Sequence, residues 1–227
     1  MRAAVLLFPG INAEQEMARA LSLVGFTPEF VESRATSLPD VKLVAIPGGF
    51  SYGDYLRSGA LAKVAPVIAA LRSFADRGGH VLGVCNGFQI LTETGLLPGA
   101  LLRNDHGRFS CKNICIRDDA NGPFSEGKGA LLHVPIAHGD GRFHIDDDGL
   151  AKLRGDGLVA YRYTDAKGST ETDGNPNGSR DAIAGIYGGP KRNILGMMPH
   201  PERMCEPLHG GVDGEAPFRR VFAALSS

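Results

Sequence analysis

The chain of 227 residues contains no tryptophan, only four cysteines and no excess of charge of either sign. Four cysteines in a chain of this length do not make a disulfide framework, which indicates a reducing, cytoplasmic setting. The 24 basic and 25 acidic residues leave a net charge of −1, so nothing favours a nucleic-acid or membrane partner. We therefore expect small molecules or other proteins as partners.

Long hydrophobic runs are also missing. No stretch reaches the roughly 18 apolar residues that a membrane-spanning helix needs. The apolar start at residues 3–8 stops at Pro9 and Gly10, and polar helical sequence follows at once, which favours a first strand over a signal peptide. The length fits one α/β domain, so we expect a single domain over residues 1–227.

Short apolar segments alternate with helical patterns through the first hundred residues. We expect strands at residues 3–8, 28–31, 42–46 and 81–84, and helices at about 12–24, 58–77 and 86–94. The first helix is expected to open with Asn12 and Gln15 as a cap pair. Solidly apolar strands that alternate with helices predict an α/β fold, with a mostly parallel sheet covered on both faces. Sites in such folds form at the carboxyl ends of the strands.

The pattern changes in the second half of the chain. Shorter alternating runs predict a mixed or antiparallel extension of the sheet, at residues 113–116, 130–136, 158–163, 183–187 and 194–198. The polar residues 165–181, rich in Gly and Asn, predict a loop. Residues 217–225 predict a closing amphipathic helix.

A cysteine framed by two glycines carries the most chemical information. Cys85 directly follows an apolar run, and Gly83 and Gly87 stand two residues before and after it. This spacing is typical of a nucleophile elbow, a strained strand-to-helix turn in which larger side chains would collide. The N-terminus of the following helix points N–H groups at the sulfur and favours the thiolate. We predict a reactive Cys85; the alternative is a buried structural cysteine.

A thiolate nucleophile needs an acid/base group, and His200 with Glu202 supplies one. The flanking Pro199 and Pro201 favour an extended backbone, in which residues two apart face the same side. Glu202 is therefore predicted to orient one ring nitrogen of His200. The alternative is an exposed turn histidine beside a solvated glutamate.

An acyl-transfer reaction also needs donors for the developing oxyanion, each worth about 3 kcal/mol when it is positioned beforehand. The backbone N–H of Asn86, directly after the nucleophile, is one candidate. Gly49, in the Gly-Gly-Phe loop at residues 48–50, is the second, because its lack of a side chain allows close backbone approach. The alternative is that the paired glycines only make a turn.

Four other patterns are rejected as sites. Residues 122–128 match most of a phosphate-binding P-loop, but Gly129 stands where the metal-binding Ser or Thr belongs. Cys111 and Cys115 lack a second pair with zinc-site spacing. We expect a solvated turn at residues 146–148, and no shared helical face for His133, His138 and His144. No metal site is predicted.

Residues 83–89 together with residues 200–202 resemble the class I, or triad, glutamine amidotransferases. Within them, the chain is similar to the glutaminase subunits of phosphoribosylformylglycinamidine synthases, a family of purine biosynthesis. The segments that carry this closer resemblance are residues 47–60, 137–143, 175–179 and 196–203. The resemblance covers nearly the whole chain and implies the flavodoxin-like fold of that class.

The resemblance implies roles for individual residues. Cys85 would be the nucleophile, His200 the acid/base and Glu202 its orienter. Glutamine contacts would come from Gln89, Arg108 and Phe109. The chain departs from the family pattern at Ile11 and Ala13, where relatives usually carry Ser and Cys, and again at Ser110 and Cys111. These departures leave the three triad positions unchanged.

The resemblance also implies a reaction and partners. Glutamine would be hydrolysed to glutamate and ammonia, and ammonia passed to a large synthetase subunit, usually with a small accessory subunit. That enzyme converts formylglycinamide ribonucleotide to formylglycinamidine ribonucleotide with ATP. We expect no cofactor in this chain, and ATP with Mg on the synthetase, because no convincing nucleotide-phosphate loop is present.

Other functions remain open at this point. One alternative is an amidotransferase subunit of another synthetase, such as those of GMP, CTP or anthranilate synthesis. Another is a free-standing cysteine hydrolase or peptidase on the same fold. A third is a non-catalytic regulatory subunit. The presence of all three triad residues argues against this alternative.

Overall fold

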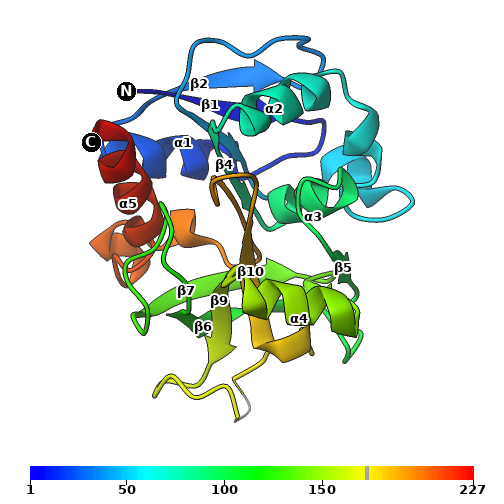
Figure 1. The fold of residues 1–227 in the computed structure, drawn as a ribbon, viewed down its shortest axis with the longest axis vertical. Coiled ribbons are helices and arrows are strands. Elements are labelled where there is room, and N and C mark those ends of the chain that lie inside the picture. The colour runs from blue at the N-terminus through cyan, green and yellow to red at the C-terminus, as the bar shows by residue number, and fades with distance from the viewer. Residues whose placement is uncertain (172–173) are drawn as a thin grey trace.

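A nine-stranded mixed sheet forms the centre of the computed structural model, which describes residues 1–171 and 174–227 (Figure 1). Its first five strands in spatial order run parallel: β2 (Thr27–Glu32), β1 (Arg2–Leu7), β3 (Leu43–Ile46), β4 (His80–Val84) and β11 (Ile194–Met197). The remaining four pair antiparallel: β10 (Ile183–Gly188), β9 (Val159–Thr164), β6 (Ser110–Asp118) and β7 (Leu131–His138). The prediction of an α/β fold with a mixed extension in its second half is confirmed.

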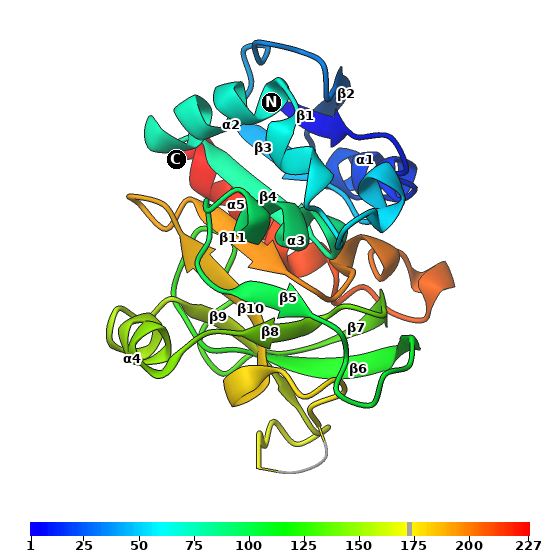
Figure 2. The same ribbon diagram turned by 90° about the vertical axis from the view of Figure 1, so that its right-hand side faces the viewer.

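Helices cover both faces of the parallel part of the sheet. In Figure 1, α1 (Glu14–Leu23) and α5 (Glu215–Ser226) lie on one side, and α2 (Val67–Asp76) and α3 (Asn86–Glu93) on the other. Every residue of β3 and β11 is buried, as expected for strands with helices on both faces. A second, two-stranded sheet of β5 (Ala100–Leu102) and β8 (Arg142–His144) lies between α3 and the antiparallel strands (Figure 2).

The helix expected at residues 58–77 is interrupted. A short 3-10 turn at Leu61–Val64 ends before Pro66, and α2 starts only at Val67. Ala65 is extended, with ψ of 138°, because a residue that precedes proline is pushed out of the helical region. Proline is tolerated at a helix start but not in the interior, so the single long helix was a wrong prediction.

The start of α1 also differs from the prediction. The helix begins after Ala13, and no side chain caps its N-terminus, so the Asn12 and Gln15 cap pair was wrong. The N–H groups of Asn12 and Ala13 instead donate to the carbonyl of Gly48, at 3.4 and 3.2 Å. The residues before α1 are therefore attached to the loop that follows β3.

The acidic run at residues 146–148 begins a helix, α4 (Asp147–Gly155), where a solvated turn was expected. The Asp146 carboxylate accepts a hydrogen bond from the Gly149 N–H at 2.7 Å. Asp147 and Asp148 stand in the first turn, where the helix dipole favours negative charge. The capping pattern was present in the sequence and was misread.

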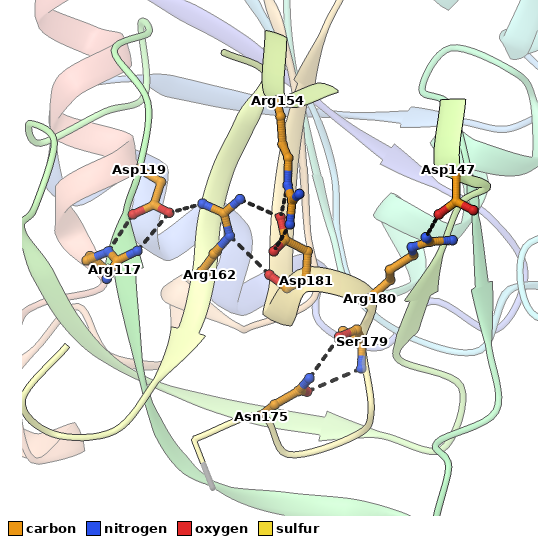
Figure 3. Close-up of polar contacts among 9 residues, drawn as sticks. All are labelled: Arg117, Asp119, Asp147, Arg154, Arg162, Asn175, Ser179, Arg180 and Asp181. Atoms are coloured by element: carbon orange, nitrogen blue, oxygen red, sulfur yellow. Dashed lines mark hydrogen bonds and ion pairs between the residues drawn. The ribbon is translucent and has the colours of Figure 1, made fainter. Parts of the chain in front are cut away.

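An ion-pair network joins the antiparallel strands to the segment that precedes β10 (Figure 3). Asp119 pairs with Arg117 and Arg162, and Asp181 pairs with Arg162 and Arg154 of α4. Burial acts to raise the pKa of Asp181, but the hydrogen bonds and charges of Arg154 and Arg162 outweigh it and lower the pKa. The network fixes one end of the loop expected at residues 165–181, of which residues 172–173 lie outside the described part.

Among the described residues, no helix has both the length and the apolar composition that crossing a membrane requires.

The contact between α3 and β3 gives a stability prediction. A Cβ atom at Gly87 would stand 2.1 Å from the carbonyl oxygen of Ile46, whereas one at Gly155 would meet no atom within 4 Å. We expect Gly87→Ala to lower the midpoint of thermal unfolding, because backbone must move to make room. Gly155→Ala, the control, should leave it unchanged or raise it, since alanine favours a helix by about 0.5 to 1 kcal/mol over glycine. Equal midpoints for the two variants would contradict this packing.

Candidate active site

Cys85 stands at the turn between β4 and α3 in a strained conformation, with φ of 51° and ψ of −105°. Such a conformation costs a non-glycine residue on the order of 1 to 3 kcal/mol and persists only where neighbours hold it. The Cys85 N–H donates to the carbonyl of Met197 on β11 at 2.8 Å. The turn therefore has the strained strand-to-helix geometry expected of a nucleophile elbow, with the thiol at the carboxyl end of β4.

His200 reaches the same place because β11 pairs with β4. The two strands run parallel with Met197 opposite Val84, so the chain leaves both at the same sheet edge. The His200 N–H donates to the carbonyl of Pro135 at 2.8 Å. The ring Nδ1 and a carboxylate oxygen of Glu202 lie 2.6 Å apart, and both side chains are buried.

The route by which Glu202 reaches His200 differs from the expectation. Residues Pro201–Arg203 form a 3-10 turn instead of an extended segment. Pro201 starts this turn, a position where its missing N–H and fixed φ cost nothing. The two side chains meet across the turn, not along one side of a strand.

The charge state of His200 follows from its neighbours. Burial acts to lower the pKa of His200, but Glu202 and Cys85 oppose it and raise the pKa to about 10. Its Nε2 atom is buried and makes no hydrogen bond of ordinary geometry with any described atom, although the thiol is near enough to influence it. His200 is therefore favoured as an imidazolium, whose Nε2, without a partner among the described atoms, can exchange a proton.

Two backbone N–H groups beside the thiol are available as donors. Neither the Gly49 N–H nor the Asn86 N–H donates to another described residue. The Phe50 N–H is instead used by the carbonyl of Gly10, at 2.9 Å. Gly49 has φ of 151°, and a Cβ there would stand 2.6 Å from the Cα of Ile11, so only glycine fits.

A cavity of about 180 Å³ opens over Cys85. Its lining includes Gly49, Phe50, Asp54, Ser58, Cys85, Gln89, Phe109, Ala137, His138, Gly139 and Asp140. Four of the residues predicted from sequence therefore share its wall, namely Gly49, Cys85, Gln89 and Phe109. Arg108 is exposed and does not line the cavity.

The amide of Gln89 is held at both ends. Its Nε2 donates to the carbonyl of Asp140 at 2.7 Å, and its Oε1 accepts from the Asn86 side chain at 2.8 Å. The Asn86 side chain in turn accepts from the Ser51 N–H at 3.1 Å. Gln89 is thus a fixed part of the cavity wall.

His138 is a cavity residue that the sequence reasoning missed. It is 3% exposed, and its Nδ1 lies 3.1 Å from the Oδ1 of Asn104. Asn104 Oδ1 also accepts from the Gly141 N–H, while its Nδ2 donates to two carbonyls. Oδ1 is therefore an acceptor, so Nδ1 of His138 carries the proton and Nε2 is a bare acceptor without a partner among the described atoms.

The hydrogen-bond network that holds His138 extends to residues 175–179. The buried Asn177 donates to the carbonyl of Gly141 at 2.9 Å, and its own backbone carbonyl accepts from the Asp105 N–H. Ser179 donates to the Asn177 side chain at 2.7 Å. The segment was recognised from the sequence only by its resemblance, and in the structure it makes hydrogen bonds to Gly141 and Asp105.

Asp54, Ser58 and Asp140 were also missed. The Ser58 hydroxyl donates to the Asp140 carboxylate at 3.1 Å. Burial raises the pKa of Asp54; the nearby Ser58 hydroxyl opposes this, and the charge of Asp140 adds to it. Each lies in one of the segments that carry the family resemblance, 47–60 or 137–143. The resemblance therefore marked the segments, but it gave no reason to single out these three residues.

The rejected patterns have other roles in the structure. The P-loop-like segment folds around the Asp118 carboxylate, which accepts from the Ser125 hydroxyl and the Glu126 N–H, both at 2.8 Å. These donors therefore bind the carboxylate of Asp118, whereas the donors of a P-loop bind a phosphate. Within the described residues, no group of three or more His, Cys, Asp or Glu side chains is placed to hold a metal ion.

A larger groove, of about 880 Å³, lies between residues 36–42 and α2. None of the residues predicted for the site lines it. The small cavity over Cys85 is therefore the candidate active site, because the strained Cys85 lines it and the buried His200, paired with Glu202, lies next to Cys85.

Comparisons with known proteins give a consistent result. Residues 1–217 match the family model of the CobB/CobQ-like glutamine amidotransferase domain. The chain is 51% identical to the phosphoribosylformylglycinamidine synthase subunit PurQ of Rhodospirillum rubrum, with all of both chains covered. It is 49% identical to the subunit of the same name from Bradyrhizobium diazoefficiens, with 100% of this chain and 97% of that protein covered.

A solved structure is similar along the whole chain. A chain in the structure of PurLQS from Thermotoga maritima matches with a TM-score of 0.86 and 41% sequence identity. The match covers 99% of this chain and 98% of that one.

The environment of His138 predicts a pH-dependent stability. Burial, and then the charge of His200, lowers the pKa of His138 to about 4. The unfolded chain takes up this proton near pH 6.5 and the folded chain does not. The contribution of His138 to the free energy of unfolding is therefore fully present above pH 6.5. It falls by on the order of 3 kcal/mol as the pH drops toward 4.

We expect His138→Gln to remove this part of the pH dependence, measured as the free energy of unfolding by urea at pH 7 and pH 4.5. His133→Gln, on the same strand but exposed, is the control and should keep the wild-type dependence. Titration of the His138 ring near pH 6.5 in the NMR spectrum of the folded protein would contradict the assignment.

Proposed function

The chain belongs to the CobB/CobQ-like glutamine amidotransferase family, and we propose that it is the glutaminase subunit of a phosphoribosylformylglycinamidine synthase. It hydrolyses glutamine to glutamate and ammonia. The ammonia passes to a synthetase subunit for the ATP-dependent conversion of formylglycinamide ribonucleotide to formylglycinamidine ribonucleotide. The end-to-end similarity to synthase subunits of that name supports this function over other amidotransferases.

The observation that carries the proposal is the meeting of three side chains at one sheet edge. Cys85 stands on a strained elbow, and the buried His200 faces it while held by Glu202 at 2.6 Å. This is the arrangement of nucleophile, acid/base and orienter that acyl transfer requires.

In the first half-reaction, the Cys85 thiolate attacks the side-chain amide carbon of glutamine. The carbonyl oxygen takes up the negative charge and accepts hydrogen bonds from the free N–H groups of Gly49 and Asn86. When the carbon–nitrogen bond breaks, His200 gives its Nε2 proton to the departing nitrogen. Ammonia leaves, and a γ-glutamyl thioester on Cys85 remains.

In the second half-reaction, the now neutral His200 takes a proton from water as that water attacks the thioester. The carbon–sulfur bond breaks, glutamate leaves, and the thiolate and imidazolium are restored. Glu202 keeps the ring oriented and stabilises its positive charge in both steps.

Substrate contacts are assigned to Gln89, Arg108 and Phe109. Phe109 and Gln89 line the cavity. Arg108 precedes Phe109 on an exposed loop, and its guanidinium makes no hydrogen bond or ion pair with another described residue, which leaves it available for the α-carboxylate of glutamine.

Ammonia in water at neutral pH is mostly protonated and then is no nucleophile, so it needs a shielded path to its acceptor. We assign the acceptor, with ATP and Mg, to the large synthetase subunit, accompanied by a small accessory subunit. The resemblance to a chain of the PurLQS structure supports this assembly. The free cysteines and the reaction itself favour a cytoplasmic enzyme.

The direct test replaces the nucleophile. In the assembled enzyme, Cys85→Ala should abolish synthesis from glutamine and leave synthesis from added ammonium intact, because the synthetase reaction does not need the thiol. Cys111→Ala, an exposed cysteine outside the cavity, is the control and should keep both activities. Continued use of glutamine by Cys85→Ala, or cleavage of peptides by an enzyme indifferent to glutamine, would contradict the proposal.

A second test concerns the orienting carboxylate. Glu202→Gln should reduce kcat/KM for glutamine by roughly 10²- to 10⁴-fold, since a related change of the orienting group in a serine protease has about the larger effect. The charge of Glu202 raises the pKa of His200, so its loss should move the alkaline limb of the pH profile to lower pH. Glu206→Gln, a change at a surface ion pair with Arg19, should leave the profile unchanged.

A further inference from the structure

Residues 103–109, which connect β5 to β6, carry two of the side chains assigned to glutamine. Phe109 lines the cavity, and Arg108 directly before it is exposed. The Arg108 guanidinium makes no hydrogen bond or ion pair with another described residue. The place from which this side chain starts is therefore fixed only through the backbone of Arg108.

Both backbone groups of Arg108 are held by side chains of its own loop. Its carbonyl accepts from Asn104 Nδ2 at 2.9 Å, and its N–H donates to Nδ1 of His106 at 3.1 Å. Asn104 is buried and donates from the same Nδ2 atom to the carbonyl of His138 at 3.0 Å. Asn104 thus ties the loop to the cavity wall, and His106 supplies the second point of attachment.

The contacts of His106 determine which ring nitrogen carries the proton. Nδ1 accepts from the Arg108 N–H, so the neutral ring carries its proton on Nε2. Nε2 lies 3.1 Å from the carbonyl oxygen of Pro176 and 3.2 Å from the hydroxyl oxygen of Ser110. A carbonyl oxygen can only accept, so Nε2–H donates to Pro176. The ring therefore connects the backbone of Arg108 to residues 175–179.

Residues 175–179 are a firm anchor for this ring. Pro176 is buried, and the backbone carbonyl of Asn177 accepts from the Asp105 N–H at 3.2 Å. Asn177 also donates to the carbonyl of Gly141 at 2.9 Å, next to the cavity residues 138–140. His106 is thereby attached to the network that holds the cavity wall, although it does not line the cavity itself.

The bond between His106 and Arg108 spans the most permissive residue of the loop. Gly107 has φ of 69°, and a Cβ there would meet no atom within 4 Å. Without the bond to Nδ1, the chain on either side of this glycine has more conformations open to it. Ordering them when glutamine binds costs entropy that a fixed loop has already lost.

We propose that His106 is a positioning residue for glutamine binding, whose Nδ1 fixes the N–H of Arg108 and so directs the guanidinium to the α-carboxylate. This inference rests on the proposed function, which assigns Arg108 to that carboxylate. The α-carboxylate takes no part in the reaction at the side-chain amide. Loss of the contact should therefore raise KM for glutamine and leave kcat unchanged.

Two substitutions separate the two ring nitrogens. In His106→Gln the side-chain amide can still donate to the carbonyl of Pro176, but the acceptor at Nδ1 is lost. In His106→Asn the side-chain oxygen can replace Nδ1, because asparagine accepts from the N–H two residues further on. The pair therefore tests the contact with Arg108 apart from the contact with Pro176.

In the assembled enzyme, we expect His106→Gln to raise KM for glutamine at least about fivefold, and His106→Asn to stay within about twofold of wild type. Both should keep kcat and the rate of synthesis from added ammonium. His209→Gln, at an exposed histidine of the 3-10 turn Pro207–His209, is the control and should keep every parameter. Equal rises of KM in His106→Gln and His106→Asn would overturn the proposal.

A double variant tests whether His106 acts through Arg108. Arg108→Met should raise KM by removing the guanidinium, and adding His106→Gln to it should raise KM no further. Effects that multiply in the double variant, or an unchanged KM in Arg108→Met, would overturn the proposal. The ¹⁵N NMR spectrum of the isolated wild-type chain should show His106 protonated on Nε2, and a proton on Nδ1 of the neutral ring would overturn it as well.

The same measurements separate this proposal from the proposed function. Wild-type KM in His106→Gln, in an enzyme that synthesises from glutamine, would overturn the role of His106 alone. Absence of glutamine-dependent synthesis by the wild-type chain with the synthase subunits of the same genome would overturn the proposed function itself.

Discussion

The parallel pairing of β4 with β11 is the constraint on which the site depends. β4 ends in the turn that displays Cys85, and β11 leads to His200, so the pairing brings Cys85 and His200 to one edge of the sheet. The hydrogen bond from Cys85 N–H to Met197 O fixes the two strand ends to each other. Loss of this pairing would separate the thiol from the imidazole even if every side chain were kept.

The remaining strands support this central pair in two ways. On one side, the parallel strands and their helices bury an apolar core that holds β4 in place. On the other side, the antiparallel strands supply the cavity wall, with His138 at the end of β7. Buried amide and hydroxyl groups around Asn104 and Asn177 link that wall to the residues before β10. The mixed sheet therefore joins the half that carries Cys85 and His200 to a half that supplies part of the polar cavity wall.

Much of this could be predicted from sequence, because the relevant patterns are local. The glycine-framed Cys85, the apolar strands and the closing helix needed only neighbouring residues to be recognised. His138 could not be assigned a role, because its partners Asn104 and His200 lie far away along the chain and only the fold brings them together. The errors at Pro66 and Asp146 have a different origin, since their local signals, a helix-breaking proline and a capping aspartate, were present and were given too little weight.

The distance along the chain between β4 and β11 also orders events during protein synthesis. A ribosome makes Cys85 and its elbow early, whereas the imidazole that the thiol needs is made near the end of translation. Contacts between segments that are distant along the chain form slowly, because closing the long loop between them costs entropy. A growing chain, or one truncated before β11, carries the thiol without the imidazole, so Cys85 can meet His200 only in a nearly complete chain.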